Sequence, residues 1–111
     1  MSRSSETVLE VALVQMSMDA DVAANMAHAQ ASVRQAAAAG AKLVCLPELF
    51  RARYFCQSED EGNFALAEPV PGPTTEAFGE LARELDITIV LSLFERRAPG
   101  LFHNTAAVVD R

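Results

Sequence analysis

A carboxylate follows a proline at the end of an apolar run in the stretch CLPELFRARYFCQ, residues 45–57. A proline pushes the residue before it toward extended backbone, so this run would lead Glu48 out rigidly after Pro47. A rigidly held carboxylate at the end of a strand can act as a general base. Position alone therefore makes Glu48 a candidate catalytic residue, and an ordinary loop glutamate paired with Arg51 or Arg53 is the alternative.

Other reactive side chains lie in the same stretch. Cys45 falls inside the apolar run, where a thiol behaves as a small buried hydrophobe. Cys56 has no histidine or lysine identified beside it, which is typical of an inert loop thiol. Without an export signal, a metal-ligand spacing or a CxxC motif, both cysteines are expected to be reduced. Tyr54 either lines the mouth of a pocket or packs under the loop, and the sequence leaves both readings open.

Further charged and imidazole side chains carry weaker signals. The acidic triplet at residues 59–61 could attract a cationic end of a substrate, although a solvated run of charge is the simpler reading. His28 falls on the polar side of an expected helix, and His103 opens an expected strand. Neither histidine has a partner at metal-ligand spacing, so the sequence predicts no metal site.

Composition limits the classes of function. The 111 residues are 50% apolar and 22% charged, which is typical of one small globular domain. The net charge of −6 excludes the basic surface that nucleic-acid binding requires. No apolar run reaches the roughly 18 residues of a membrane span, and the polar start is unlike a signal peptide. A cytoplasmic protein that binds neither nucleic acid nor membrane is expected.

In the first half of the chain, two apolar strands should flank a helix. Residues 7–16 and 41–47 are almost continuously apolar, as in strands buried on both faces. Between them, Asp19 or Asp21 can cap a helix that ends before Gly40, where a left-handed backbone favours glycine. Its apolar positions recur every three or four residues, at Val22, Met26, Ala29, Val33 and Ala36.

The second half should contain a long loop, a helix and a hairpin. Residues 50–73 are long for a structureless connection, which indicates a functional loop. Thr74 or Thr75 can cap a helix in which Phe78, Leu81, Ala82 and Leu85 share one face. Residues 87–94 read as a strand, residues 95–100 as a turn, and residues 103–110 as a strand antiparallel to the first.

The order strand, helix, strand, helix, strand, strand predicts an α/β fold. Right-handed crossovers would give a mostly parallel sheet, extended by the antiparallel hairpin. Two helices cannot cover both faces of four strands, so part of one face should be bare and apolar, which invites a partner surface. The sequence stops directly after a strand, and we expect residues 1–111 to be a partial domain, truncated at the C-terminus.

Several motifs resemble a known family. VALVQM, GAKLVCLPELF and ITIVLSLFE are similar to the amino-terminal part of the nitrilase superfamily of carbon–nitrogen hydrolases, over essentially the whole chain. Within it, PELFRARYFCQ, SLFERR and FHNTAAVVD most resemble the N-carbamoylputrescine amidases, with β-ureidopropionase-like enzymes as the alternative. The resemblance implies a four-layer αββα sandwich, a small ureido or amide substrate, no cofactor, and homo-oligomers assembled through the sandwich faces.

The resemblance also implies a triad of glutamate, lysine and cysteine, in which Glu48 occupies the position of the glutamate. The family's lysine comes after the hairpin and its cysteine later still, so Lys42, Cys45 and Cys56 do not correspond to them. Tyr54 is the candidate substrate-binding residue. The chain by itself is then expected to be inactive. A hypothesis of another class is a noncatalytic module that folds by pairing its open sheet with another chain.

Overall fold

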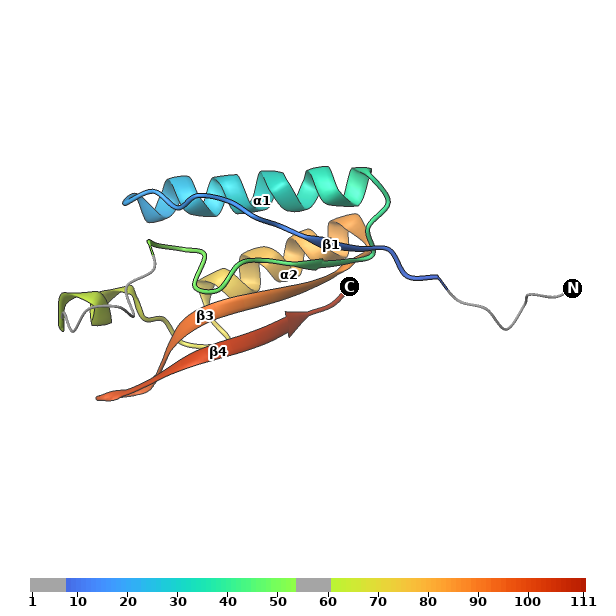
Figure 1. Cartoon of the computed structure of the whole chain (residues 1–111). Coiled ribbons are helices and arrows are strands. Elements are labelled where there is room, and N and C mark those ends of the chain that lie inside the picture. Colours follow the sequence, from blue (N-terminus) through green and yellow to red (C-terminus); the bar gives the residue numbers. More distant parts are fainter. Residues whose placement is uncertain (1–7, 54–60) are drawn as a thin grey trace, which may run out of the picture.

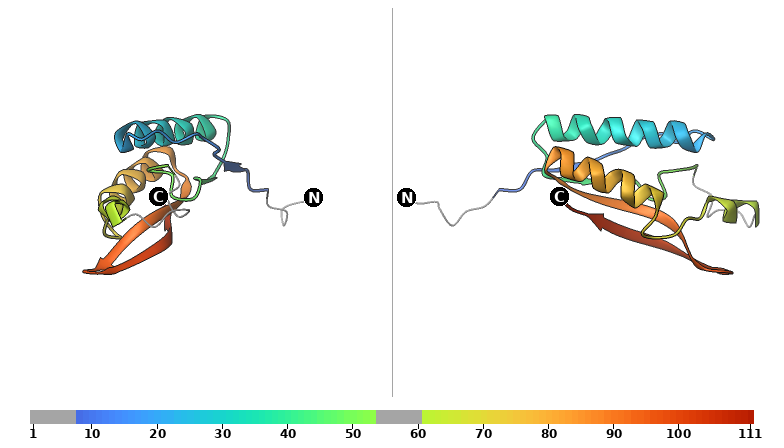
Figure 2. Two further views of the ribbon diagram at one scale, coloured as in Figure 1. Left: turned by 60° about the vertical axis from the view of Figure 1, so that its left-hand side comes forward. Right: turned by 180° about the vertical axis from the view of Figure 1, so that it is seen from behind.

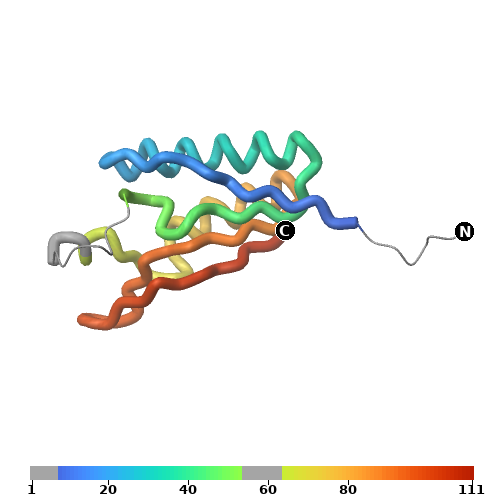
Figure 3. The backbone as a smooth tube through the Cα atoms, in the orientation of Figure 1, coloured from blue at the N-terminus to red at the C-terminus, as the bar shows by residue number. Residues whose placement is uncertain are grey.

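The computed structural model describes residues 8–53 and 61–111. Its elements follow the expected order, with one additional 3₁₀ helix, η2, in the long loop. They are β1 (Val11–Leu13), α1 (Val22–Ala38), β2 (Leu43–Cys45), η2 (Glu61–Leu66), α2 (Pro73–Leu85), β3 (Thr88–Ala98) and β4 (Leu101–Val109). The strands form one sheet in the order β1-β2-β3-β4, and Figure 3 shows their backbones side by side.

The pairing of the strands confirms the predicted fold class. β1 pairs parallel to β2, β2 pairs parallel to β3, and β3 and β4 form an antiparallel hairpin. The helices α1 and α2 connect the three parallel strands and pack on the same face of the sheet (Figures 1 and 2). The carboxyl ends of β1, β2 and β3 therefore all lie at the same end of the sheet.

Helix α1 begins and ends as the sequence predicts. The carboxylate of Asp21 accepts a hydrogen bond from the backbone N–H of Ala23 at 3.0 Å, so Asp21 is the cap that satisfies a free amide of the first turn. Ala29 and Val33 are buried on the predicted stripe. Gly40 has a φ of +107°, a backbone conformation that side chains other than glycine rarely adopt.

The start of α2 differs from the prediction that Thr74 or Thr75 is its cap. The cap is Gly72, and Pro73 takes the first helical position, which suits its fixed φ and its missing N–H. The hydroxyl of Thr75 accepts a hydrogen bond from the Gly72 N–H at 2.7 Å, so this threonine serves the cap from inside the helix. Thr74 is free for another contact, with Glu68.

Strand lengths also differ from the prediction. β1 and β2 have three residues each. The parallel pairing of these two strands ends before Pro47, because proline has no N–H to donate. The hairpin is longer than expected, and residues 95–98, predicted as part of a turn, continue β3 to Ala98 with a register shift after Arg96. The turn itself is confined to Pro99 and Gly100.

The core lies between the sheet and the two helices. The largest buried side chains come from both layers: Phe50, Phe78, Ile89, Leu91, Leu93, Val33 and Val44. On the opposite face, Val11, Leu13 and Val108 are 51%, 76% and 66% exposed. We call this the uncovered face of the sheet, and its apolar side chains agree with the bare face that the count of helices predicts. In the described part of the chain, no helix has the length and apolarity to cross a membrane.

Candidate active site

Glu48 lies just beyond the carboxyl end of β2, where the chain turns away from the sheet. Its side chain is exposed, and its Oε1 accepts a hydrogen bond of 2.7 Å from the Nδ2 of Asn104 on β4. Within residues 8–53 and 61–111, no ion pair joins Glu48 to Arg51 or Arg53, and Arg51 pairs with Glu68 instead. The pairing with Arg51 or Arg53 that the alternative expected is therefore not found among the described residues.

The backbone on both sides of Glu48 is held by β3. The N–H of Leu46 donates to the carbonyl of Val90 at 3.0 Å, and the N–H of Leu49 donates to the hydroxyl of Ser92 at 3.0 Å. Leu49 has a φ of +51°, an uncommon conformation for a residue other than glycine, and its side chain is buried. The surrounding contacts must therefore maintain this turn, as is common where a chain presents a functional side chain.

The residues after Glu48 anchor the turn to both helices. The ring of Phe50 is fully buried and packs edge-to-face against Phe78 of α2, with the centroids 5.5 Å apart. The carbonyl of Arg51 accepts a hydrogen bond of 2.8 Å from the side chain of Asn25 on α1, which is itself buried. The turn is thus fixed to the sheet on one side of Glu48 and to the core on the other.

A second carboxylate, Glu68, is buried near this turn. It forms an ion pair with Arg51 and accepts hydrogen bonds from the backbone N–H of Thr74 at 3.2 Å and from its hydroxyl at 2.9 Å. Its backbone bonds to β3 through Phe94 and Arg96. All these partners hold the loop against α2 and β3, so Glu68 has a structural role.

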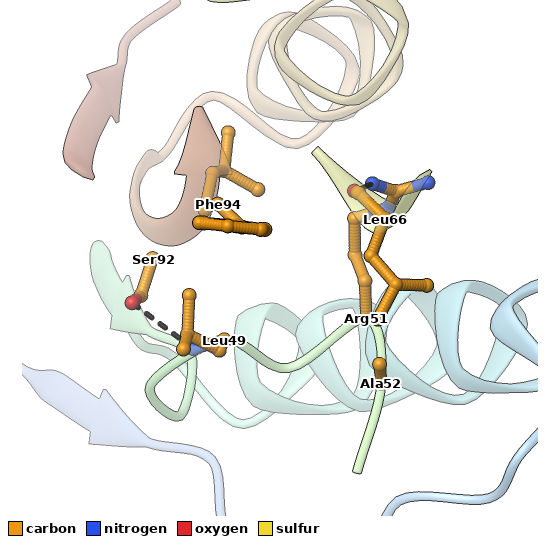
Figure 4. Close-up of a pocket in the computed structure, with 7 residues that line it drawn as sticks. Leu49, Arg51, Ala52, Leu66, Ser92 and Phe94 are labelled. Carbon is orange, nitrogen blue, oxygen red and sulfur yellow. Dashed lines mark hydrogen bonds between the residues drawn. The ribbon is translucent and has the colours of Figure 1, made fainter. Parts of the chain in front are cut away.

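Two hollows border the turn. A small pocket behind it is lined mainly by apolar groups, and Figure 4 shows the hydrogen bond between Ser92 and Leu49 at its wall. Its lining residues are Leu49, Arg51, Ala52, Leu66, Ser92, Leu93 and Phe94. A wider, open hollow lies beside Pro47 and is lined also by Gln15, Met16 and Ser17, which follow β1. The carboxyl ends of β1 and β2 thus offer an open surface next to Glu48, as expected in α/β sheets.

The other sequence candidates fall elsewhere. Tyr54 and Cys56 lie outside the described residues, as do the first two acids of the triplet at residues 59–61. Cys45 is a free thiol but is only partly buried, because it lies on the uncovered face rather than in the core. His28 and His103 are exposed, and the described residues contain no cluster of side chains that could hold a metal ion.

Lys42 and Glu48 lie beyond opposite ends of β2. Sequence reasoning missed Asn104 and Ser92, the two polar side chains that hold this site. Their one signal was the predicted hairpin, but the pairing of β3 with β2 places Ser92 and the pairing of β4 with β3 places Asn104.

A positioned carboxylate beyond the carboxyl ends of parallel strands defines a candidate site for acid–base chemistry on an α/β scaffold. Residues 10–111 match the family described as carbon–nitrogen hydrolase, and the chain belongs to this family. The resemblance of its motifs to the nitrilase superfamily is thereby confirmed.

The sequence identity to individual relatives is consistent with this family assignment. The chain is 38% identical over 104 residues to an N-carbamoylputrescine amidase of Solanum lycopersicum, covering 93% of this chain and 34% of that protein. It is 33% identical over 103 residues to a citrullinase of Francisella tularensis, covering 92% of this chain and 36% of that protein. The chain thus spans about a third of the length of the curated relatives it matches.

A solved structure supports the same fold. The crystal structure of a carbon–nitrogen hydrolase from Helicobacter pylori G27 superposes with a TM-score of 0.84 at 31% identity. The match covers 92% of this chain and 35% of that chain. The α/β architecture of strands and helices predicted from the sequence is therefore that of a nitrilase-type fold.

Proposed function

We propose that this chain is part of an N-carbamoylputrescine amidase, which hydrolyses N-carbamoylputrescine to putrescine, carbon dioxide and ammonia without a cofactor. The observation that carries the proposal is the 38% identity to an enzyme of that name across nearly the whole chain. Glu48, held at the carboxyl edge of the sheet by Asn104, supports it because a positioned carboxylate can act as a general base in hydrolysis.

Glu48 is one member of the proposed site. In the proposed reaction a thiol attacks the ureido carbonyl, and Glu48 takes the thiol proton and later activates water. A lysine stabilises the negative charge that develops on the carbonyl oxygen. Lys42 is the only lysine of the sequence and lies beyond the amino end of β2, so it is not this group. We propose that residues 1–111 are a partial domain and that the lysine and cysteine belong to the rest of a longer hydrolase.

The uncovered face supports the proposal of a partial domain. Its apolar side chains would pack against a second sheet of the longer hydrolase, giving the four-layer αββα sandwich that the resemblance implies. Tyr54, which follows Glu48 in the sequence, is proposed as a substrate contact, and the longer hydrolase is proposed to form homo-oligomers through its sandwich faces.

A second candidate is another ureido hydrolase of the same family. The 33% identity to a citrullinase favours it, because citrulline and N-carbamoylputrescine both carry a ureido group on a linear aliphatic chain. The two differ at the far end, where citrulline has an amino acid group and N-carbamoylputrescine has an ammonium group. Contacts to that end decide the specificity.

A comparison of substrates tests the proposal. The full-length hydrolase is assayed for ammonia release from N-carbamoylputrescine, citrulline and N-carbamoyl-β-alanine. We expect kcat/KM for N-carbamoylputrescine to exceed the others by at least about 100-fold, since sites that pair a polar group discriminate strongly against substrates lacking it. Equal or higher kcat/KM for citrulline or N-carbamoyl-β-alanine would overturn the assignment. The 111-residue chain assayed alone should release no ammonia.

A further inference from the structure

We propose that Asn104 is a positioning residue that fixes the carboxylate of Glu48 for proton transfer, an inference that rests on the proposed role of Glu48. Its Nδ2 lies 2.7 Å from the Oε1 of Glu48. An ionised carboxylate only accepts hydrogen bonds, so Asn104 must present its NH₂ group to it. Hydrogen bonds to a charged group are among the stronger ones.

The backbone that carries Asn104 is itself fixed. Asn104 lies within β4 and pairs with Phe94 of β3 in the hairpin ladder. The same strand β3 supplies Val90 and Ser92, which bind the backbone on either side of Glu48. The hairpin therefore holds both the main chain around Glu48 and the direction of its side chain.

The hydrogen bond from Asn104 gives the two carboxylate oxygens of Glu48 different roles. Asn104 occupies Oε1, and among the described residues no second donor binds this carboxylate, which leaves Oε2 for the proton. In the proposed attack the S–H bond of the thiol breaks and its proton moves to Oε2, while the sulfur electron pair forms the C–S bond and the carbonyl π pair moves to the oxygen. When that pair re-forms the carbonyl, a C–N bond of the ureido group breaks and the departing amine takes the proton from Oε2, which completes the acylation. A carboxylate with one fixed orientation loses less freedom on reaching that geometry.

Asn104 belongs to neither the predicted triad nor the predicted substrate contacts. Its side chain lies on an antiparallel strand, 56 positions after Glu48 in the sequence. The neighbouring His103 is also exposed, but alternation along the strand directs it to the other face of the sheet. His103 therefore provides a matched control on the same strand.

The kinetic test uses the full-length hydrolase and its best substrate from the panel above. We expect Asn104→Ala to lower kcat by about 10- to 100-fold with KM nearly unchanged, because the base is present but poorly oriented. Asn104→Asp preserves shape but places a second carboxylate against Glu48, and we expect a larger loss of kcat. His103→Ala should keep the wild-type kcat.

A structural role for Asn104 predicts a different pattern. The near-isosteric Asn104→Asp would then rescue activity relative to Asn104→Ala, and kcat would follow the fraction of folded protein. That pattern, or a wild-type kcat in Asn104→Ala, would overturn the positioning role.

A spectroscopic measurement tests the contact without turnover. The side-chain amide resonances of Asn104 in ¹⁵N-labelled full-length protein should move when Glu48 is replaced by glutamine, and should not move in His103→Ala. Resonances unchanged by Glu48→Gln would contradict the contact. If the wild type hydrolyses none of the panel substrates, the proposed function fails, and the amide resonances then decide the contact independently.

Discussion

The two faces of the sheet carry similar apolar side chains in opposite environments. Leu91 and Val44 face the helices and are fully buried, whereas Leu13 and Val108 on the uncovered face are mostly exposed. Adjacent residues of a strand point to opposite faces, so this difference follows from which face the two helices cover. The comparison shows that apolar residues at alternate positions do not by themselves say which face is the core.

Two carboxylates, Glu68 and Glu48, show the same contrast between a buried and an exposed environment. Glu68 is buried, and the Arg51 ion pair and two Thr74 hydrogen bonds occupy its oxygens. Glu48 is exposed at the strand end, and a single hydrogen bond from Asn104 holds it. A fully partnered carboxylate stabilises a loop, and a singly partnered one has an oxygen available for proton transfer.

The largest expected effect is the loss of turnover in Glu48→Gln. Glutamine keeps the size of the side chain but cannot take a proton, so kcat of the full-length hydrolase should fall by about 10²- to 10⁴-fold. The stability should change little, because the side chain is exposed. Acylation is measured by single-turnover kinetics, and unfolding by a denaturant titration.

Glu68→Gln is the matched control for this prediction. It leaves the charge of Arg51 uncompensated in a mostly buried position, so it should cost about 3–5 kcal/mol of stability. The folded variant should retain most of its turnover. A Glu48→Gln enzyme with normal kcat, or a Glu68→Gln enzyme with normal stability, would remove the contrast between the two carboxylates.

A second comparison makes the same leucine-to-alanine substitution on each face of the sheet. Leu91→Ala opens a cavity in the core and should lower the free energy of unfolding by about 2–5 kcal/mol. Leu13→Ala in the 111-residue chain should cost less than about 0.5 kcal/mol, since the side chain is 76% exposed. In the full-length hydrolase the proposed second sheet would bury Leu13 and raise that cost to at least about 2 kcal/mol.

Denaturant midpoints of the wild type and of each variant give these values. A Leu13→Ala cost that stays near zero in the full-length protein would contradict the proposed second sheet. A small loss of unfolding free energy in Leu91→Ala would mean that the core collapses into the cavity. That result would contradict the close packing of the face that the helices cover.

Much of the fold could be predicted from local patterns. The apolar spacing of α1, its cap at Asp21 and the glycine at position 40 all agree with the structure, because each depends on neighbours within a few residues. The start of α2 was mispredicted because Pro73 and Gly72 compete with the threonines for the first positions. The extent of the hairpin was missed because continued cross-strand pairing overrides the local turn signals.

The candidate site was predictable only in part. The position of Glu48 after an apolar run and a proline indicated a strand end, and the structure places it there. Asn104 and Ser92 could not be assigned to it, because their contacts depend on the register of β4 against β3 and on the turn at Leu49. Contacts between residues far apart in the sequence need the assembled sheet.

The smallest expected effect concerns an exposed ion pair between the helices. Arg34 of α1 donates two hydrogen bonds to Glu84 of α2, on the surface away from the sheet. The hydrogen bond from Arg34 lowers the pKa of Glu84 below its ordinary value. A carboxylate with a lowered folded-state pKa stabilises the protein above its unfolded pKa, and this stabilisation is lost as the pH falls through the folded pKa.

Glu84→Gln should therefore destabilise the protein slightly at about pH 7, and this difference should shrink as the pH falls through the lowered folded-state pKa of Glu84 and disappear once the wild-type carboxyl is protonated. Salt at about 1 M should also remove most of the difference, because both side chains are exposed to solvent. Urea midpoints of the wild type and the variant under these conditions measure it. A difference that persists at low pH and high salt would mean that Glu84 contributes through packing between α1 and α2, and the pair would then resemble the buried contacts of the covered face.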